Sequence, residues 1–122
     1  MLSTNEILDR HLQSFAGYDV DGLLSDYSSA AVFFTPKSTL IGPNEIRPLF
    51  EDLVREFAKP GCSFTMQQRQ IQGDSAYIIW TAETADNSYE FATDTFLVRE
   101  GKIVLQSFAA RIMPKPGTNL KN

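Results

Sequence analysis

The chain has 122 residues, 43% of them hydrophobic and 21% charged, which is the size and composition of one globular domain spanning 1–122. Its net charge is −4 and its eleven Lys and Arg residues are outnumbered by fifteen acids, so nucleic acid is excluded as an expected partner. No apolar run approaches the roughly 20 residues of a membrane span, and the N-terminal stretch is amphipathic where a signal peptide would be apolar, so we expect a cytoplasmic protein that does not contact membranes.

Two helices are predicted in the first 26 residues. Ser3 is followed three positions later by Glu6, the pattern of a capping box, and apolar residues then recur at helical spacing until Gly17. Asp19 can cap a second, short helix in the segment VDGLLSDY.

A short strand and a long helix are predicted next. The apolar run AAVFFTP ends at Pro36 and is typical of a strand. After the Gly-Pro pair at 42–43, apolar residues recur at helical spacing over 46–57. Pro48 indicates either a helix that begins later than this pair or a kink, because an interior proline removes a backbone hydrogen bond.

The second half of the chain predicts a β-meander. Four runs rich in β-branched and aromatic residues span 63–72, 75–85, 88–100 and 102–113, and the turns between them are short. Helices in the first half and an antiparallel meander in the second indicate an α+β fold in which helices cover one face of a curved sheet. The last segment, 114–122, is typical of a flexible tail.

Three segments carry a resemblance to a known family: GYDVDGLLSDYSSAAVFFTP, LIGPNEIRPLFEDL and TDTFLVREGKIVLQSF. From about Glu6 to Ile112 the chain resembles the NTF2-like superfamily, in particular its SnoaL-like and ketosteroid-isomerase-like members. The resemblance implies a cone of about three N-terminal helices packed on a strongly curved, mostly antiparallel sheet, with a central pocket and dimerisation through the outer sheet face. The superfamily includes isomerases, cyclases, dehydratases, hydrolases and binding domains without chemistry.

Period-two alternation sorts the strand residues by face, and the direction of the family's pocket identifies the inner face. Asp94 then looks into the cavity with residues of its own and neighbouring strands: Trp80, Ala82, Thr84, Glu90, Ala92, Phe96, Val98, Gln106, Phe108, Ala110 and Ile112. The opposite face carries a set too apolar for open water: Ile79, Tyr89, Phe91, Leu97 and Leu105. We therefore expect a homodimer that pairs through this face.

Only some of the active-site residues of ketosteroid isomerases have a matching residue in this chain. Asp94 falls at the position of their protonated aspartic acid, which donates a hydrogen bond to the substrate oxygen. Their aspartate base corresponds to Thr35, whose hydroxyl cannot take a proton from carbon at neutral pH, so steroid isomerisation by that route is not expected. Their tyrosine donor corresponds to His11, which lies on the apolar face of the first helix and would meet Asp94 across the pocket.

His11 and Asp94 are thus the candidate catalytic residues. A buried imidazole and a buried carboxylate favour each other's charged forms, and they form an acid/base pair if they lie within about 3 Å of each other or of a shared water. The candidate ligand-binding residues are Trp80, Phe108, Phe96, Gln106, Thr35, Phe50 and Ala110. No metal or cofactor is expected, because one histidine without clustered carboxylates cannot supply three or four ligands and no nucleotide-binding motif is present.

Two functions follow from this site, and the sequence leaves open whether the protein is an enzyme. The first is cofactor-independent acid/base chemistry of isomerase, cyclase or hydrolase type on a small hydrophobic, oxygen-bearing molecule, in a cavity of roughly hundreds of Å³. The second is a domain that binds an apolar metabolite without turnover, or that only associates as a dimer. A purely structural role also fits, with His11 as a core residue and Asp94 as an anchor for backbone or for Arg111.

Overall fold

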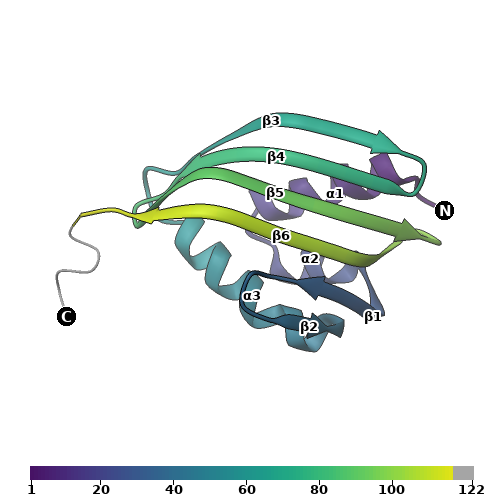
Figure 1. The fold of residues 1–122 in the computed structure, drawn as a ribbon. Coiled ribbons are helices and arrows are strands. Elements are labelled where there is room, and N and C mark those ends of the chain that lie inside the picture. The colour runs from purple at the N-terminus through teal and green to yellow at the C-terminus, as the bar shows by residue number, and fades with distance from the viewer. Residues whose placement is uncertain (117–122) are drawn as a thin grey trace.

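The computed structural model describes residues 1–116, and in this part of the chain three helices cover one face of a six-stranded sheet (Figure 1). Among these residues, no helix is both long enough and apolar enough to cross a membrane. The elements in chain order are α1 (Thr4–Ala16), α2 (Val20–Ser25), β1 (Tyr27–Phe34), β2 (Thr39–Ile41), α3 (Gly42–Phe57), β3 (Ser63–Gln72), β4 (Ser75–Glu83), β5 (Asn87–Arg99) and β6 (Lys102–Pro114).

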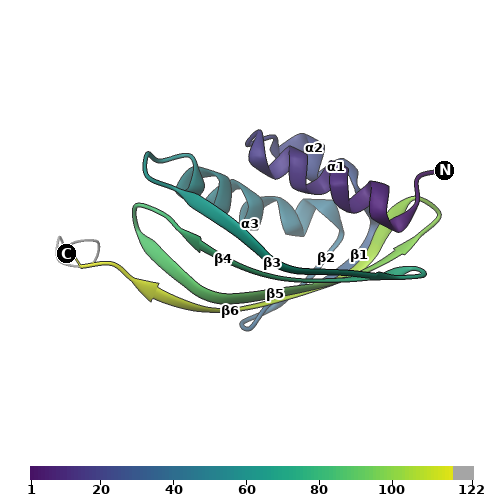
Figure 2. The same cartoon turned by 90° about the horizontal axis from the view of Figure 1, so that it is seen from above.

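The sheet has the strand order β2-β1-β6-β5-β4-β3. All neighbouring strands are antiparallel except β1 and β6, which are parallel, so β3 to β6 form the predicted meander. The sheet bends around the helices, which all lie on its concave side (Figure 2). The predicted α+β architecture with a curved, mostly antiparallel sheet is therefore confirmed.

The first two helices begin where the sequence predicts. The Ser3 side chain accepts a hydrogen bond from the Glu6 backbone, and the Glu6 carboxylate accepts one from the Ser3 backbone, which completes the capping box. Asp19 caps α2 by accepting from the backbone N–H of Gly22. Both caps satisfy donors that the first turn of a helix leaves without partners.

Helix α3 begins at Gly42, directly after strand β2. Gly42 has φ +81°, and a Cβ atom at this position would lie 2.8 Å from the backbone carbonyl oxygen of Ser29. Only glycine tolerates both the left-handed backbone and this close approach. Pro43 occupies the first turn, whereas Pro48 lies inside the helix, so α3 does not begin later than the Gly-Pro pair.

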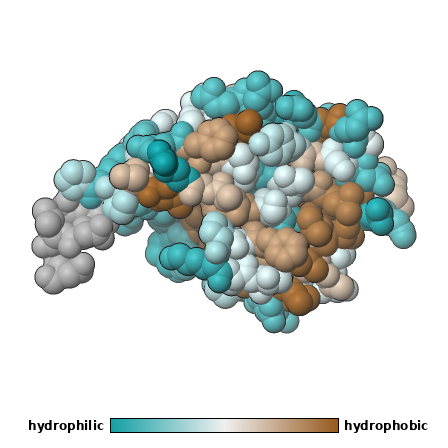
Figure 3. Space-filling view, viewed as in Figure 1, coloured by the Kyte–Doolittle hydropathy of each residue, from teal (hydrophilic) through white to brown (hydrophobic). Residues whose placement is uncertain are grey.

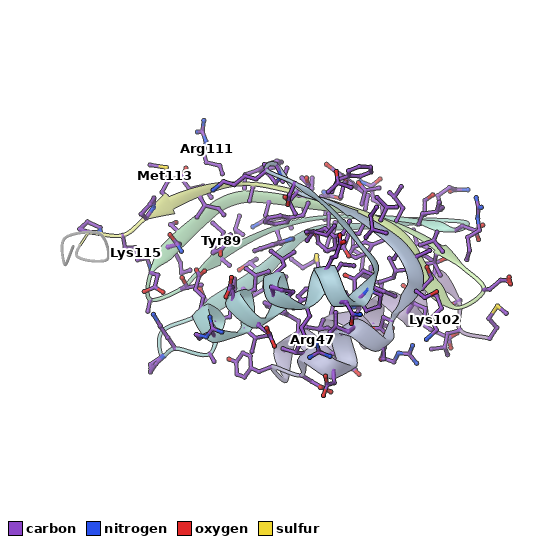
Figure 4. The ribbon with its side chains drawn as sticks, turned by 90° about the horizontal axis from the view of Figure 1, so that it is seen from below. Arg47, Tyr89, Lys102, Arg111, Met113 and Lys115 are labelled. Carbon is purple, nitrogen blue, oxygen red and sulfur yellow. The ribbon has the colours of Figure 1, made fainter. Side chains whose placement is uncertain are left out.

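Strand β5 departs from simple alternation near its start. The pairing of β5 with β6 shifts register between Tyr89 and Phe91, as a β-bulge does. Tyr89 is consequently buried and points toward α3 (Figure 4), where its hydroxyl donates to the Glu56 carboxylate, and Glu90 is exposed. The assignment of Tyr89 to the outer face and of Glu90 to the inner face is therefore wrong, because one extra residue reverses the side-chain directions before it.

The first two residues of the predicted tail, Pro114 and Lys115, belong to the end of β6 or are bonded next to it. Pro114 is the last residue of β6, and the backbone N–H of Lys115 donates to the carbonyl of Asp86. The Lys115 ammonium pairs with Glu83 and donates to the carbonyl of Thr84. The rest of the predicted tail, residues 117–122, lies outside the described part of the chain.

Candidate functional site

An apolar cavity of about 80 Å³ lies between α1, α3 and the concave face of the sheet. The only polar side chains among its lining residues are those of His11, Trp80, Asp94 and Gln106. A second hollow of about 250 Å³ shares four lining residues with it: Leu12, Phe15, Phe57 and Phe64. The two hollows therefore adjoin, as an inner cavity with an outer vestibule.

Asp94 lies in this cavity because alternation along β5 turns it inward between Ile78 of β4 and Phe108 of β6. Its side chain accepts two hydrogen bonds, from the indole Nε1 of Trp80 at 2.8 Å and from the amide Nε2 of Gln106 at 2.8 Å. Burial raises the pKa of the Asp94 carboxyl from 3.8 to about 6, although the two hydrogen bonds and the charge of His11 act in the opposite direction. Asp94 is thus a buried carboxyl that can gain or lose a proton near neutral pH.

His11 is also buried, but neither of its ring nitrogens faces Asp94. Nδ1 lies 2.9 Å from a carboxylate oxygen of Asp26, and Nε2 lies 3.2 Å from the hydroxyl of Tyr27. The ring also packs edge-on against Phe50 and Phe96. His11 therefore does not form the expected hydrogen bond with Asp94, and the two residues are connected only through other side chains.

Tyr27 and Gln106 make this connection. The Tyr27 hydroxyl donates to Oε1 of Gln106 at 2.5 Å, and the amide of the same glutamine donates to Asp94. Burial, followed by the charges of Asp94 and Asp26, raises the pKa of Tyr27 well above its usual value, so its hydroxyl stays protonated. His11 and Asp94 are therefore connected by hydrogen bonds through two neutral side chains.

Asp26 is the charged residue of the site that the sequence did not reveal. It is fully buried at the C-terminal end of α2, where it accepts from Arg10 Nε at 2.7 Å as well as pairing with His11. One signal was present in the sequence, because an acid at the C-terminal end of a helix is disfavoured by the helix dipole and needs a cation nearby.

The structure brings most of the predicted ligand-binding residues together. Trp80, Phe108, Gln106 and Phe50 all line the inner cavity. The other three lie elsewhere. Phe96 is buried behind the His11 ring and lines no part of this cavity, and Thr35 is bonded to Ser38 in the turn between β1 and β2. Ala110 lines an open hollow with Phe91 and Arg111.

Comparison with known proteins places the chain in a family. The family model described as SnoaL-like domain matches residues 8–106, well over half of the chain. The chain belongs to the SnoaL-like domain family. A comparison of this SnoaL-like protein with curated proteins found no match.

Solved structures similar to this SnoaL-like protein confirm the predicted NTF2-like fold. An NTF2-like protein of unknown function from Mesorhizobium loti is 24% identical, with a TM-score of 0.74 and coverage of 88% of this chain and 90% of that one. A ketosteroid-isomerase-like protein from Kribbella flavida is 13% identical, with a TM-score of 0.71 and coverage of 98% and 87%. TerC, co-crystallised with polyporic acid, is 16% identical, with a TM-score of 0.71 and coverage of 88% and 91%.

Proposed function

We propose that this SnoaL-like protein binds a small hydrophobic, oxygen-bearing molecule and uses Asp94 and His11 for cofactor-independent acid/base chemistry of isomerase, cyclase or hydrolase type. The observation that carries the proposal is the Asp94 carboxyl, which lines an apolar cavity and is held by side-chain donors rather than backbone donors. Its pKa of about 6 is close to the operating pH, where a carboxyl is most effective at both accepting and returning a proton.

The shape of the two hollows supports a ligand with one polar end. The inner cavity has room for a carbonyl or hydroxyl group and a few carbon atoms, and the larger vestibule offers apolar walls to the rest of the molecule. TerC, a protein of the same fold, was crystallised with polyporic acid, which is also an oxygen-bearing organic molecule. In this protein, the oxygen of the ligand would lie against Asp94 and the aromatic rings of Trp80 and Phe108.

The alternative is a domain that binds an apolar metabolite without turnover. The observation that favours it is the completeness of the hydrogen bonding, because each carboxylate oxygen of Asp94 already has a donor and each ring nitrogen of His11 already has a partner. A ligand would then fill the vestibule and leave these bonds intact.

Exchange of carbon-bound hydrogen in D₂O tests the two functions against each other. Cyclohexanone, acetophenone and 2-tetralone are the probes, because loss of an α-proton to a base replaces hydrogen with deuterium and is followed directly by proton NMR. We expect the wild type to accelerate exchange of at least one probe above pH 6 and the Asp94→Asn variant to lose about 100-fold of that rate.

The matched control for this experiment is Thr93→Asn, which introduces the same side chain one position earlier, on the outer face of β5 beside Phe91. Its exchange rate should equal that of the wild type. Quenching of Trp80 fluorescence by a probe, with no exchange above the buffer rate for any of the three, would reject acid/base chemistry and support the alternative.

We also propose that two copies of the protein pair through the convex face of the sheet. Apolar residues gather over the strands on this face (Figure 3). Alternation places Tyr77 and Phe91 on the side opposite to Ile78 and Asp94, where they are 37% and 52% exposed. Arg111 projects from the same side of the sheet, away from the helices (Figure 4). A second copy would cover this surface with the same residues, as the two-fold symmetry of a homodimer requires.

A further inference from the structure

The polar residues of the site form one continuous line of hydrogen bonds. Five contacts of 2.5 to 3.2 Å join six side chains taken from α1, the α2–β1 junction and three strands. In order, the line is Asp26, His11, Tyr27, Gln106, Asp94 and Trp80.

The two ends of the line have fixed roles. The indole N–H of Trp80 can only donate, so one oxygen of Asp94 always accepts from it. At the other end, one oxygen of Asp26 accepts from Arg10 Nε and the other lies 2.9 Å from Nδ1 of His11, so Nδ1 carries the proton of this bond. The donor and the acceptor can exchange roles only in the hydrogen bonds that lie between Nε2 of His11 and the second oxygen of Asp94.

Two complete patterns satisfy these inner bonds. In the pattern of the structure, Gln106 donates to Asp94 and accepts from Tyr27, so the Tyr27 oxygen is free to accept and Nε2 of His11 must carry a proton. His11 is then an imidazolium and Asp94 a carboxylate. The two cations, Arg10 and His11, balance the two anions, Asp26 and Asp94.

The second pattern arises when the Gln106 amide turns over, which exchanges its oxygen and nitrogen with little change of shape. Its N–H₂ group then faces Tyr27, whose hydroxyl must donate to Nε2 of a neutral His11. Its oxygen faces Asp94, which must be protonated in order to donate to it. Both patterns hold the same number of protons: one proton resides on His11 Nε2 in the first and on the Asp94 carboxyl in the second.

We propose that Tyr27 and Gln106 are positioning residues that couple the two ends of this line, so that a proton gained by Asp94 favours loss of the proton on Nε2 of His11. Mixed patterns are disfavoured because each would place two donors or two acceptors face to face in a buried site. This coupling rests on the acid/base function proposed above and extends it. When Asp94 takes a proton, Nε2 of His11 is prepared to release one.

The rings that α3 and β5 place against His11 are apolar. Helix α3 presents Phe50 to His11, and β5 presents Phe96. The Glu56 carboxylate on α3 accepts from the hydroxyl of Tyr89. Tyr89 packs against Trp80 but is not a member of the line, so it offers a matched control for Tyr27.

The ring nitrogens of His11 report the pattern directly, because His11 is the only histidine of the chain. In ¹⁵N NMR spectra, Asp94→Asn should imitate a protonated Asp94, since its amide can donate to Gln106 while its oxygen accepts from Trp80. We expect this substitution to lower the proton affinity of Nε2 at least about tenfold, while Nδ1 keeps its proton. In a Tyr27→Phe or Gln106→Met background, Asp94→Asn should have less than about a third of that effect.

Three results would overturn the coupling. The first is an equal effect of Asp94→Asn in the Tyr27→Phe and wild-type backgrounds, which would assign it to through-space charge alone. The second is its loss in a Tyr89→Phe background. The third is a change of less than about threefold in the proton affinity of Nε2 when Asp94→Asn is made in the wild-type background. None of these measurements uses a ligand, so the coupling and the proposed acid/base function can fail separately.

Discussion

In the folded protein, the surroundings of Asp94 disfavour the charged form of its carboxyl group. Burial in the cavity raises its pKa to about 6, against an ordinary value of 3.8. Folding therefore takes up a proton between about pH 4 and pH 6. Since the folded state binds more protons than the unfolded state in this window, stability falls as the pH rises through it, and the whole loss is present above pH 6.

Asp94→Asn removes this pH dependence because the amide has no charge to bury. The free energy of unfolding of the variant minus that of the wild type should be about 2–3 kcal/mol larger at pH 7 than at pH 4, because only the wild type loses stability over this range. Urea unfolding followed by circular dichroism at the two pH values measures this difference. The exposed Asp52→Asn on α3 serves as a control without such a change. If the two proteins differ in free energy of unfolding by the same amount at both pH values, burial does not disfavour the charged form of Asp94.

The residues of the site were predictable to the extent that they follow local periodicity. Trp80, Gln106 and Phe108 line the cavity because alternation along their strands is regular where they lie. Asp26 was missed, and Tyr27 was expected to face inward only as the last residue of the second helix, because the junction between α2 and β1 that orients both side chains has no periodicity. The partner of His11 was therefore assigned to Asp94 instead of Asp26.

At the scale of elements, the start of α3 depends on one glycine. Gly42→Ala would place a methyl group 2.8 Å from the Ser29 carbonyl oxygen in a backbone of φ +81°. We expect a loss of about 2–4 kcal/mol in the free energy of unfolding, from backbone strain and the clash together. Thermal unfolding measures this loss as a lower melting temperature.

Gly73→Ala is the matched control for this loss. Gly73 also has a positive φ, +57°, but no atom lies within 4 Å of the position of an added Cβ. Only the backbone strain of about 1 kcal/mol should remain. Equal melting temperatures for the two variants would mean that α3 can shift away from β1 without loss.

Whole elements were predicted more reliably than their irregularities. Capping boxes, apolar stripes and short turns identified the helices and the meander, because these patterns are local in sequence. The β-bulge at 89–91 and the parallel pairing of β1 with β6 were not visible, because both depend on contacts between distant segments. The bulge alone moved Tyr89 from the expected outer face into the core.

At the scale of the whole molecule, the convex sheet face is the feature to test. Phe91→Glu places a charge at a side chain that is 52% exposed in the proposed contact between two copies. We expect light scattering to give twice the chain mass of 13.7 kDa for the wild type and a single chain mass for the variant. Leu2→Glu, on an exposed apolar residue at the N-terminus, should remain dimeric. A wild type that is monomeric at micromolar concentration would reject the contact.

The sequence by itself determined the fold class and the order of the elements other than the short strand β2, because hydrophobic periodicity and capping are written in neighbouring residues. The inward position of Asp94 followed from alternation along its strand together with the family resemblance. Only the tertiary structure decided which polar side chains meet. Asp26, Tyr27 and Gln106 come from separate elements, and their hydrogen bonds with His11 and Asp94 exist only once the helices have packed on the curved sheet. Buried polar groups must then find partners among whatever side chains the packing brings within reach, and no local pattern records that choice.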